Sequence, residues 1–291
     1  TDNTLIGYDA GTAITTGDQN TALGSYALDA TTTGGQNTAV GYNALTAHTT
    51  GNYNVAFGYA ALDTNTTASY NVAIGAHALD ANTTGANNVA VGYQALDANT
   101  TANDNTAVGH NALTANTTGA NNTAVGGGAL ASNTTASSNV ALGRYAAGST
   151  TTGDRNTALG YATLYNNTVG DRNVAIGHRS LYTMNPASNA DTMNVGVGYA
   201  ALEATTTGVN NTGVGGFVMQ ANTTGTDNTA IGEQALVSNT TGDNNTAVGA
   251  NALDNNTTAD NNTAIGFSAL DANTTGTRNI AIGAYALDAA T

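Results

Sequence analysis

A single pattern of polar and apolar positions repeats along the whole chain. A typical copy begins with asparagine, followed by Thr or Val, Ala, an aliphatic residue and Gly, as in Asn71–Gly75. The asparagine returns every seventeen residues, with one interval of twenty-one, and seventeen copies lie between Asn3 and Asn279. We number the repeat from this asparagine. Position 5 is then Gly, position 8 is mostly Ala, position 9 is mostly Leu, and positions 12 to 14 are often Asn-Thr-Thr.

The repeat is too short for a pair of helices, and its β-branched residues before an invariant Gly favour a short strand that ends in a tight turn. A period of seventeen fits one turn of a β-solenoid, in which each coil is stabilised by stacking on its neighbours. We therefore predict an all-β fold: a parallel β-solenoid, or β-roll, of seventeen coils.

Side chains alternate across a strand, so positions 2 and 4 share one face and position 3 lies on the other. Position 4 is aliphatic in nearly every copy, and we predict that it forms the core together with the leucine of position 9. Position 2, which is Thr or Val, is expected at the edge of the core. Position 3 is Ala or Gly in every copy except the first, which has Leu5. This predicts close packing on that face, with a second chain as a candidate partner.

The interval of twenty-one residues adds four residues to one coil. The segment 182–193 contains this insertion and the chain's only proline, Pro186. Because the flanking repeats resume at once, we predict a bulging surface loop within a single solenoid domain over residues 1–291. A binding feature or a contact between chains is the alternative for this loop.

The chain starts and stops within ordinary repeats, without atypical terminal copies. Solenoids usually cover their exposed strand edges. Two explanations stay open: the chain is part of a longer protein, or chains stack end to end into a filament.

The asparagine of position 1 is predicted to form a structural ladder of stacked amides, as in cross-β arrays. The residues of this ladder include Asn20, Asn37, Asn54, Asn71, Asn88, Asn105 and Asn122.

The Asn-Thr-Thr of positions 12 to 14 forms a column of N-glycosylation sequons, which suggests a glycan coat. Turn formation by Asn and Thr side chains explains the same residues without sugar. The candidate acceptors are Asn65, Asn82, Asn99, Asn116, Asn133, Asn222, Asn239, Asn256 and Asn273.

Tyrosines gather at positions 6 and 7, after the glycine turn, and are predicted to lie outside the coil. Aromatic side chains with polar tips are favoured at interfaces, so this stripe is a candidate contact between chains or a strip that binds glycans. Its main candidates are Tyr42, Tyr59, Tyr93, Tyr161 and Tyr199.

The composition limits the partners and sites that can be expected. Charged residues make up 8% of the chain, there is no lysine, and the net charge is −14, so nucleic acid is not an expected partner. There is no cysteine, and no apolar run is long enough for membrane insertion.

The four histidines share no column, so no catalytic or metal constellation is expected and no enzyme is predicted. Aspartates do form columns at position 10 and at positions 16 and 17. They leave Ca²⁺ as a candidate cofactor, with solvated surface charge as the alternative.

The run Asn71-Val72-Ala73-Ile74-Gly75-Ala76-His77-Ala78 resembles the head repeats of YadA-like trimeric autotransporter adhesins and the repeat tracts of phage tail fibres. The resemblance covers essentially the whole chain. It implies a parallel β-roll, often trimeric, that lies outside a cell or virion and serves in attachment. The repeat here is longer than that of the adhesin heads, and neither stalk nor anchor is visible in the sequence.

We therefore expect a structural protein of an extracellular fibre, adhesin or tail-fibre shaft, located at a cell or virion surface. Its partners would be further copies of itself, in a homo-oligomer or filament, and a surface glycan or receptor. Two alternatives stay open. One is an ice-binding protein that uses the regular Thr columns at positions 13 and 14, and the other is a carbohydrate-binding solenoid.

Overall fold

The computed structural model describes residues 2–188 and 190–289, and these contain β-strands and no helix. Contacts divide the chain into two compact units, residues 1–144 and 145–291, and each is a parallel β-solenoid. The predicted fold class is thus confirmed, whereas the prediction of a single domain over 1–291 stays a prediction.

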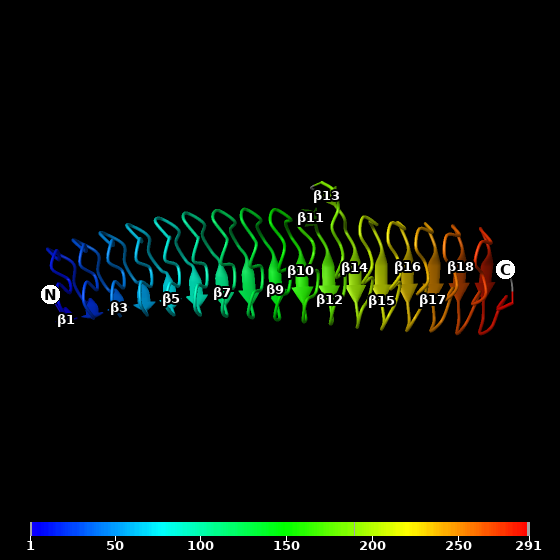
Figure 1. Ribbon diagram of the computed structural model, residues 1–291, viewed down its shortest axis with the longest axis horizontal. Helices are drawn as coiled ribbons and strands as arrows, with labels where there is room; N and C mark the ends of the chain where they lie inside the picture. Colours follow the sequence, from blue (N-terminus) through cyan, green and yellow to red (C-terminus); the bar gives the residue numbers. More distant parts are fainter. Residues whose placement is uncertain (1, 189, 290–291) are drawn as a thin grey trace. The chain divides into compact units, whose positions relative to one another are not determined.

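The strands of each unit follow one another in chain order (Figure 1). The first unit contains β1 (Thr4–Ile6), β2 (Thr21–Leu23), β3 (Thr38–Val40), β4 (Val55–Phe57), β5 (Val72–Ile74), β6 (Val89–Val91), β7 (Thr106–Val108), β8 (Thr123–Val125) and β9 (Val140–Leu142). The second contains β10 (Thr157–Leu159), β11 (Gly170–Asp171), β12 (Val174–Ile176), β13 (Ala190–Asp191), β14 (Val195–Val197), β15 (Thr212–Val214), β16 (Thr229–Ile231), β17 (Thr246–Val248), β18 (Thr263–Ile265) and β19 (Ile280–Ile282).

Residues seventeen apart lie on top of one another, as predicted. Thr106 pairs with Thr123, and Val91 pairs with Val108, in parallel register. Hydrogen bonds between coils continue beyond the strands: the Leu113 N–H donates to the Ala129 carbonyl at 3.0 Å, and the Thr117 N–H donates to the Thr134 carbonyl at 2.9 Å. Each coil is therefore tied to the next around much of its circumference, and not only along its sheet.

The turn after each strand depends on the glycine of position 5. At Gly109 the φ angle is 135°, and a Cβ atom would lie 2.7 Å from the carbonyl carbon of Gly126 in the next coil. Both the positive φ and the close approach of backbone exclude a side chain here. Non-glycine residues at positions 7, 9 and 17 also have positive φ, including Asn111 at 55° and Leu113 at 52°. The buried leucine therefore sits in a left-handed conformation that is costly for an L-residue.

The core lies on the opposite face of the strand from the one we predicted. Alanines of position 3, such as Ala107, are fully buried, whereas position 4 points outward: Phe57 is 55% exposed and Ile231 is 44% exposed. The prediction that position 4 forms the core is wrong. The prediction for position 9 is confirmed, because leucines such as Leu113 are fully buried.

Space inside the coil explains this choice of face. Leucine of position 9 projects across the coil toward the strand: a Cβ atom built on Gly213, at position 3, would meet Met219 Cε at 3.2 Å and Leu202 Cδ1 at 3.4 Å. Only a methyl group or a hydrogen fits opposite the large side chain. A second layer of branched side chains would overfill the interior, so the small residue faces in and the large one faces out.

The insertion in the segment 182–193 forms a bulge, as predicted. Its strand β13 pairs in parallel with β11 in a separate two-stranded sheet, and it projects beyond the neighbouring coils (Figure 1). Asn185, Ala187 and Ser188 are exposed, and the segment's residue 189 lies outside the described residues.

Candidate functional site

The asparagines of position 1 line the interior as a continuous ladder. The backbone N–H of Asn54 donates to Asn37 Oδ1 at 2.9 Å, and the N–H of Asn122 donates to Asn105 Oδ1 at 2.9 Å. The amide nitrogen also acts within its own coil, where Asn105 Nδ2 donates to the Gly119 carbonyl at 2.9 Å. All seven ladder residues named above are at most 1% exposed. The side chains satisfy buried backbone groups, which is a structural role.

The asparagines of position 12 form a second buried ladder. Asn99 Nδ2 donates to Asn82 Oδ1 at 2.8 Å and to the Ala102 carbonyl at 3.1 Å. The nine predicted sequon asparagines are 0% or 1% exposed. A glycan would have to be attached to Nδ2, which is enclosed and hydrogen-bonded in the folded coil. This geometry favours the alternative, a structural role for these asparagines, and the glycan coat stays a prediction.

His48 takes the place of asparagine in this second ladder. Its Nδ1 accepts a hydrogen bond from Asn65 Nδ2 at 3.0 Å, so that Nε2 carries the proton and donates to the Gly51 carbonyl at 2.8 Å. The ring is fully buried, and this burial lowers the pKa of His48 below its usual value. The neutral imidazole thus completes the ladder as an uncharged member.

The outward face of the strands is uncharged and largely apolar in both units. It consists of the columns of positions 2 and 4, which hold only Thr, Val, Ile, Leu and Phe57. We call these columns the outer sheet face. Several of its members are more than a third exposed, among them Leu23, Ile74, Leu142 and Val214. Contiguous apolar surface of this kind is characteristic of an interaction site.

Beside the outer sheet face, the side chains of positions 6 and 7 form an aromatic ladder. In the first unit it contains Tyr8, Tyr26, Tyr42, Tyr59, His77, Tyr93 and His110, with successive ring centroids 5.2 to 6.4 Å apart. In the second unit it contains Tyr145, Tyr161, His178, Tyr199 and Phe217. The tyrosines are exposed, as predicted, apart from the half-buried Tyr26.

Three histidines belong to this ladder, so the prediction that the histidines share no column is wrong for His77, His110 and His178. The signal was present in the sequence, because these residues occupy positions 6 and 7 and imidazole is aromatic. His178, for example, stacks on Tyr199 with ring centroids 5.2 Å apart and planes 7° apart. Their role in the structure is ring packing.

The same stacking bears on the two alternative functions. In pairs such as Tyr42–Tyr59, with planes 8° apart, each ring covers one face of its neighbour. The threonines of position 13 are also engaged: Thr117 Oγ1 donates to the Thr134 carbonyl at 3.0 Å. Only the neighbouring column at position 14 leaves its threonines exposed. The ladder rings and the threonines of position 13 are therefore engaged within the structure, and both alternative functions stay predictions.

The aspartates of position 10 lie close enough to affect one another. Burial, reinforced by the charge of Asp80, raises the pKa values of Asp63 and Asp97. His77 Nδ1 lies 2.9 Å from Asp80 Oδ2. Among residues 2–188 and 190–289, however, no three His, Cys, Asp or Glu side chains converge in a way that could hold a metal ion. The Ca²⁺ hypothesis gains no geometric support from this column.

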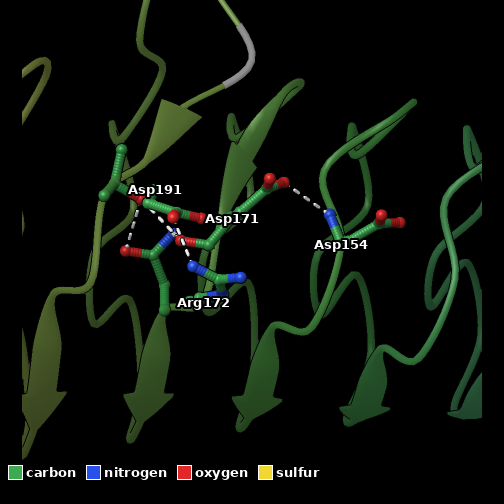
Figure 2. Close-up of polar contacts among 6 residues, drawn as sticks. Asp154, Asp171, Arg172 and Asp191 are labelled. Carbon is green, nitrogen blue, oxygen red and sulfur yellow. Dashed lines mark hydrogen bonds and ion pairs between the residues drawn. The ribbon is translucent and has the colours of Figure 1, made fainter.

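A group of charged side chains lies at the base of the insertion (Figure 2). Arg172 forms an ion pair with Asp191, and the Thr192 hydroxyl donates to the Asp171 carbonyl at 3.0 Å. The Asp171 carboxylate accepts from the Asp154 N–H at 2.7 Å. Burial raises the pKa of Asp171, and the neighbouring charges of Asp154 and Asp191 add to this effect. These contacts clamp the inserted segment onto the coils.

One hollow interrupts the regular surface of the second unit. Four tyrosines and an arginine surround it, and it has a volume of about 250 Å³. Two of these tyrosines, Tyr165 and Tyr182, occupy position 10, where most copies have other residues. Sequence reasoning missed this site. The only available signal was a pair of aromatic residues seventeen apart in a column that holds no other aromatic residue.

Comparison with known proteins adds no assignment, because a scan against protein-family models and a search of curated proteins both gave no match. Within the part of the chain that the structure describes, no helix has the length and apolar character to cross a membrane.

Proposed function

We propose that this chain is a structural shaft protein of an extracellular fibre or adhesin, whose coils associate side by side with further copies of the chain. The observation that carries the proposal is the outer sheet face, an uncharged and largely apolar surface that runs along the coils of each unit. A surface of this kind is costly to leave in water, and burial against a partner removes that cost.

A second copy of the chain is the partner that fits this face best. It presents the same columns at the same spacing from coil to coil, so that a contact made by one coil is repeated by the next. The chain's net charge of −14 opposes association. Its acidic columns lie at positions 10, 16 and 17, outside the outer sheet face, so this face can be buried without burying a carboxylate.

The location and role in attachment rest on chemistry and resemblance. The chain is poor in charge, lacks lysine, and devotes its hydrogen-bonding side chains to holding coils together. The adhesin and tail-fibre repeats that it resembles form assemblies, often trimers, outside a cell or virion. A trimer is thus the first assembly to test.

The test is the mass of the purified chain in solution, measured by sedimentation equilibrium between about 1 and 100 µM, a range in which specific interfaces are populated. We expect an oligomer. The double variant Phe57→Glu/Ile74→Glu places two charges on the outer sheet face and should shift the protein to monomer.

The matched control is Thr67→Glu/Thr84→Glu, which adds the same charge to the same two coils at the exposed position 14. It should leave the mass unchanged. Circular dichroism would check that both variants keep the β fold. A wild-type chain that stays monomeric throughout this range, or two variants with equal effects, would contradict side-by-side association.

A further inference from the structure

The hollow in the second unit arises where a small residue interrupts the surface columns. Ala162 occupies position 7 between Tyr145 and Arg179 of the adjacent coils, and it is only 5% exposed. Tyr161, Tyr165 and Tyr182 complete the lining. Because the methyl group cannot fill the space that a ring or guanidinium fills above and below it, a depression is left at the base of the aromatic side chains. We call it the tyrosine hollow.

The rings around the tyrosine hollow combine a stacked pair with perpendicular pairs. Tyr165 and Tyr182 stack on each other at 5.6 Å with planes 9° apart. Tyr145 stands nearly perpendicular to both Tyr161 and Tyr165, at 72° and 78°. Ring faces and ring edges therefore border the same space, together with phenol hydroxyl groups. This combination suits a ligand that is apolar on one side and rich in hydroxyl groups at its rim.

Polar side chains extend the site beyond the rings. The Arg179 guanidinium lies over the Tyr182 ring, 4.4 Å from its centroid, and its Nε is 2.8 Å from Glu203 Oε1. Glu203 Oε2 in turn accepts from Gln220 Nε2 at 2.8 Å. Arg179, Glu203 and Gln220 also line a second hollow of about 520 Å³ that reaches Val237. The two hollows share Arg179, so an elongated ligand can contact both.

Charge decides between classes of ligand. Arg179 is paired with Glu203, which leaves the site close to neutral, and the chain as a whole carries −14. An acidic sugar would therefore be repelled. A quaternary ammonium group, which aromatic cages often bind, would meet the guanidinium already seated on Tyr182. A neutral ligand with alternating hydroxyl donors and acceptors satisfies both constraints.

From these contacts we propose that the tyrosine hollow and the adjoining hollow form a binding groove for a neutral oligosaccharide. One sugar ring would pack its C–H face against the tyrosines, and the next would exchange hydrogen bonds with Arg179, Glu203 and Gln220. A hollow of about 250 Å³ lies just below the usual range for drug-sized ligands, which suits a single sugar ring. All of these residues belong to one unit of one chain, so the groove does not depend on the proposed self-association.

The experiment is a screen of the full chain against an array of neutral and acidic oligosaccharides, followed by titration calorimetry with the best neutral binder. We expect a neutral oligosaccharide to bind, and Tyr165→Ala to weaken its affinity at least 10-fold. Tyr70→Ala is the matched control, because Tyr70 stacks on Tyr53 at 5.1 Å in a similar exposed pair far along the sequence. It should leave the affinity unchanged.

Two further variants test for misfolding and for the role of charge in the groove. Tyr165→Phe preserves the ring and should retain binding, which separates the loss of a binding surface from misfolding of Tyr165→Ala. Glu203→Gln frees the charge of Arg179 and should raise the affinity for acidic sugars relative to neutral ones. Absence of any bound neutral oligosaccharide, or equal losses in Tyr165→Ala and Tyr70→Ala, would overturn the proposal. Neither result would bear on the oligomer mass that tests the shaft.

Discussion

Replacing Asn105 with alanine tests whether the inner asparagine ladder stabilises the coils. The Asn105 side chain accepts from the Asn122 N–H of the next coil and donates to the Gly119 carbonyl of its own coil. Without it, the buried Asn122 N–H has no acceptor. The Gly119 carbonyl keeps its second donor, Asn116 Nδ2, at 3.0 Å. One buried donor is thus orphaned and one hydrogen bond to a buried carbonyl is lost. Water replaces the third contact of Asn105 Nδ2, with the carbonyl of the exposed Asn103 at 3.2 Å.

The expected cost follows from these two losses. An unsatisfied buried N–H costs about 1–3 kcal/mol and the additional hydrogen bond contributes about 1 kcal/mol, so we expect a destabilisation of about 2–4 kcal/mol. Solenoids can unfold coil by coil, so a local probe is preferable to a global transition. Hydrogen exchange of the amides in β8 (Thr123–Val125) should accelerate by about 30-fold to several hundred-fold, since each 1.4 kcal/mol is a factor of ten.

Asn103→Ala provides the matched control. Asn103 is in the same coil-to-coil turn, and its Oδ1 accepts from the Ala86 N–H at 2.7 Å, but it is exposed. Water replaces the lost acceptor there, so exchange in β8 should change by less than about 3-fold, as is usual for surface substitutions. Equal acceleration in the two variants, or no acceleration in Asn105→Ala, would refute the view that burial gives the ladder its importance.

Three further predictions address the interior. Ala107→Leu should lower the free energy of unfolding by about 1–3 kcal/mol through overpacking, whereas Val108→Thr, on the outer face, should change it by less than about 0.5 kcal/mol in denaturant titrations of dissociated protein. Gly109→Ala should cost more than about 2 kcal/mol by the same measurement, because it adds strain at a positive φ and a backbone clash; Gly127→Ala should cost far less, since a Cβ there would lie 3.9 Å from its nearest neighbour, the His110 carbonyl oxygen. For His48 the lowered pKa means that the unfolded chain binds the proton first, so stability should fall as the pH drops below about 6.5. The free energy of unfolding of the wild type, measured relative to that of His48→Asn, should therefore fall between pH 8 and pH 5. A difference that does not change with pH would contradict this assignment.

The groove was beyond the reach of sequence reasoning for a physical reason. Its residues come from six coils, and the concavity of the tyrosine hollow depends on what is missing at Ala162 more than on any motif. An alanine at a surface position carries no signal by itself. Once the coils are stacked, however, it leaves a space between Tyr145 and Arg179 that neither residue fills.

The sequence by itself determined the period, the parallel stacking and the residues in each column, because every coil must present like groups to like groups along the axis. It also identified Leu of position 9 as core and the tyrosines of positions 6 and 7 as surface. It could not decide which strand face turns inward, since alternation separates positions 2 and 4 from position 3 without naming the inner set. Tertiary packing made that choice. The leucine of position 9 occupies the interior and leaves room opposite only for alanine, so the large side chains of position 4 lie outside, and the sequon asparagines turn inward to satisfy buried backbone groups.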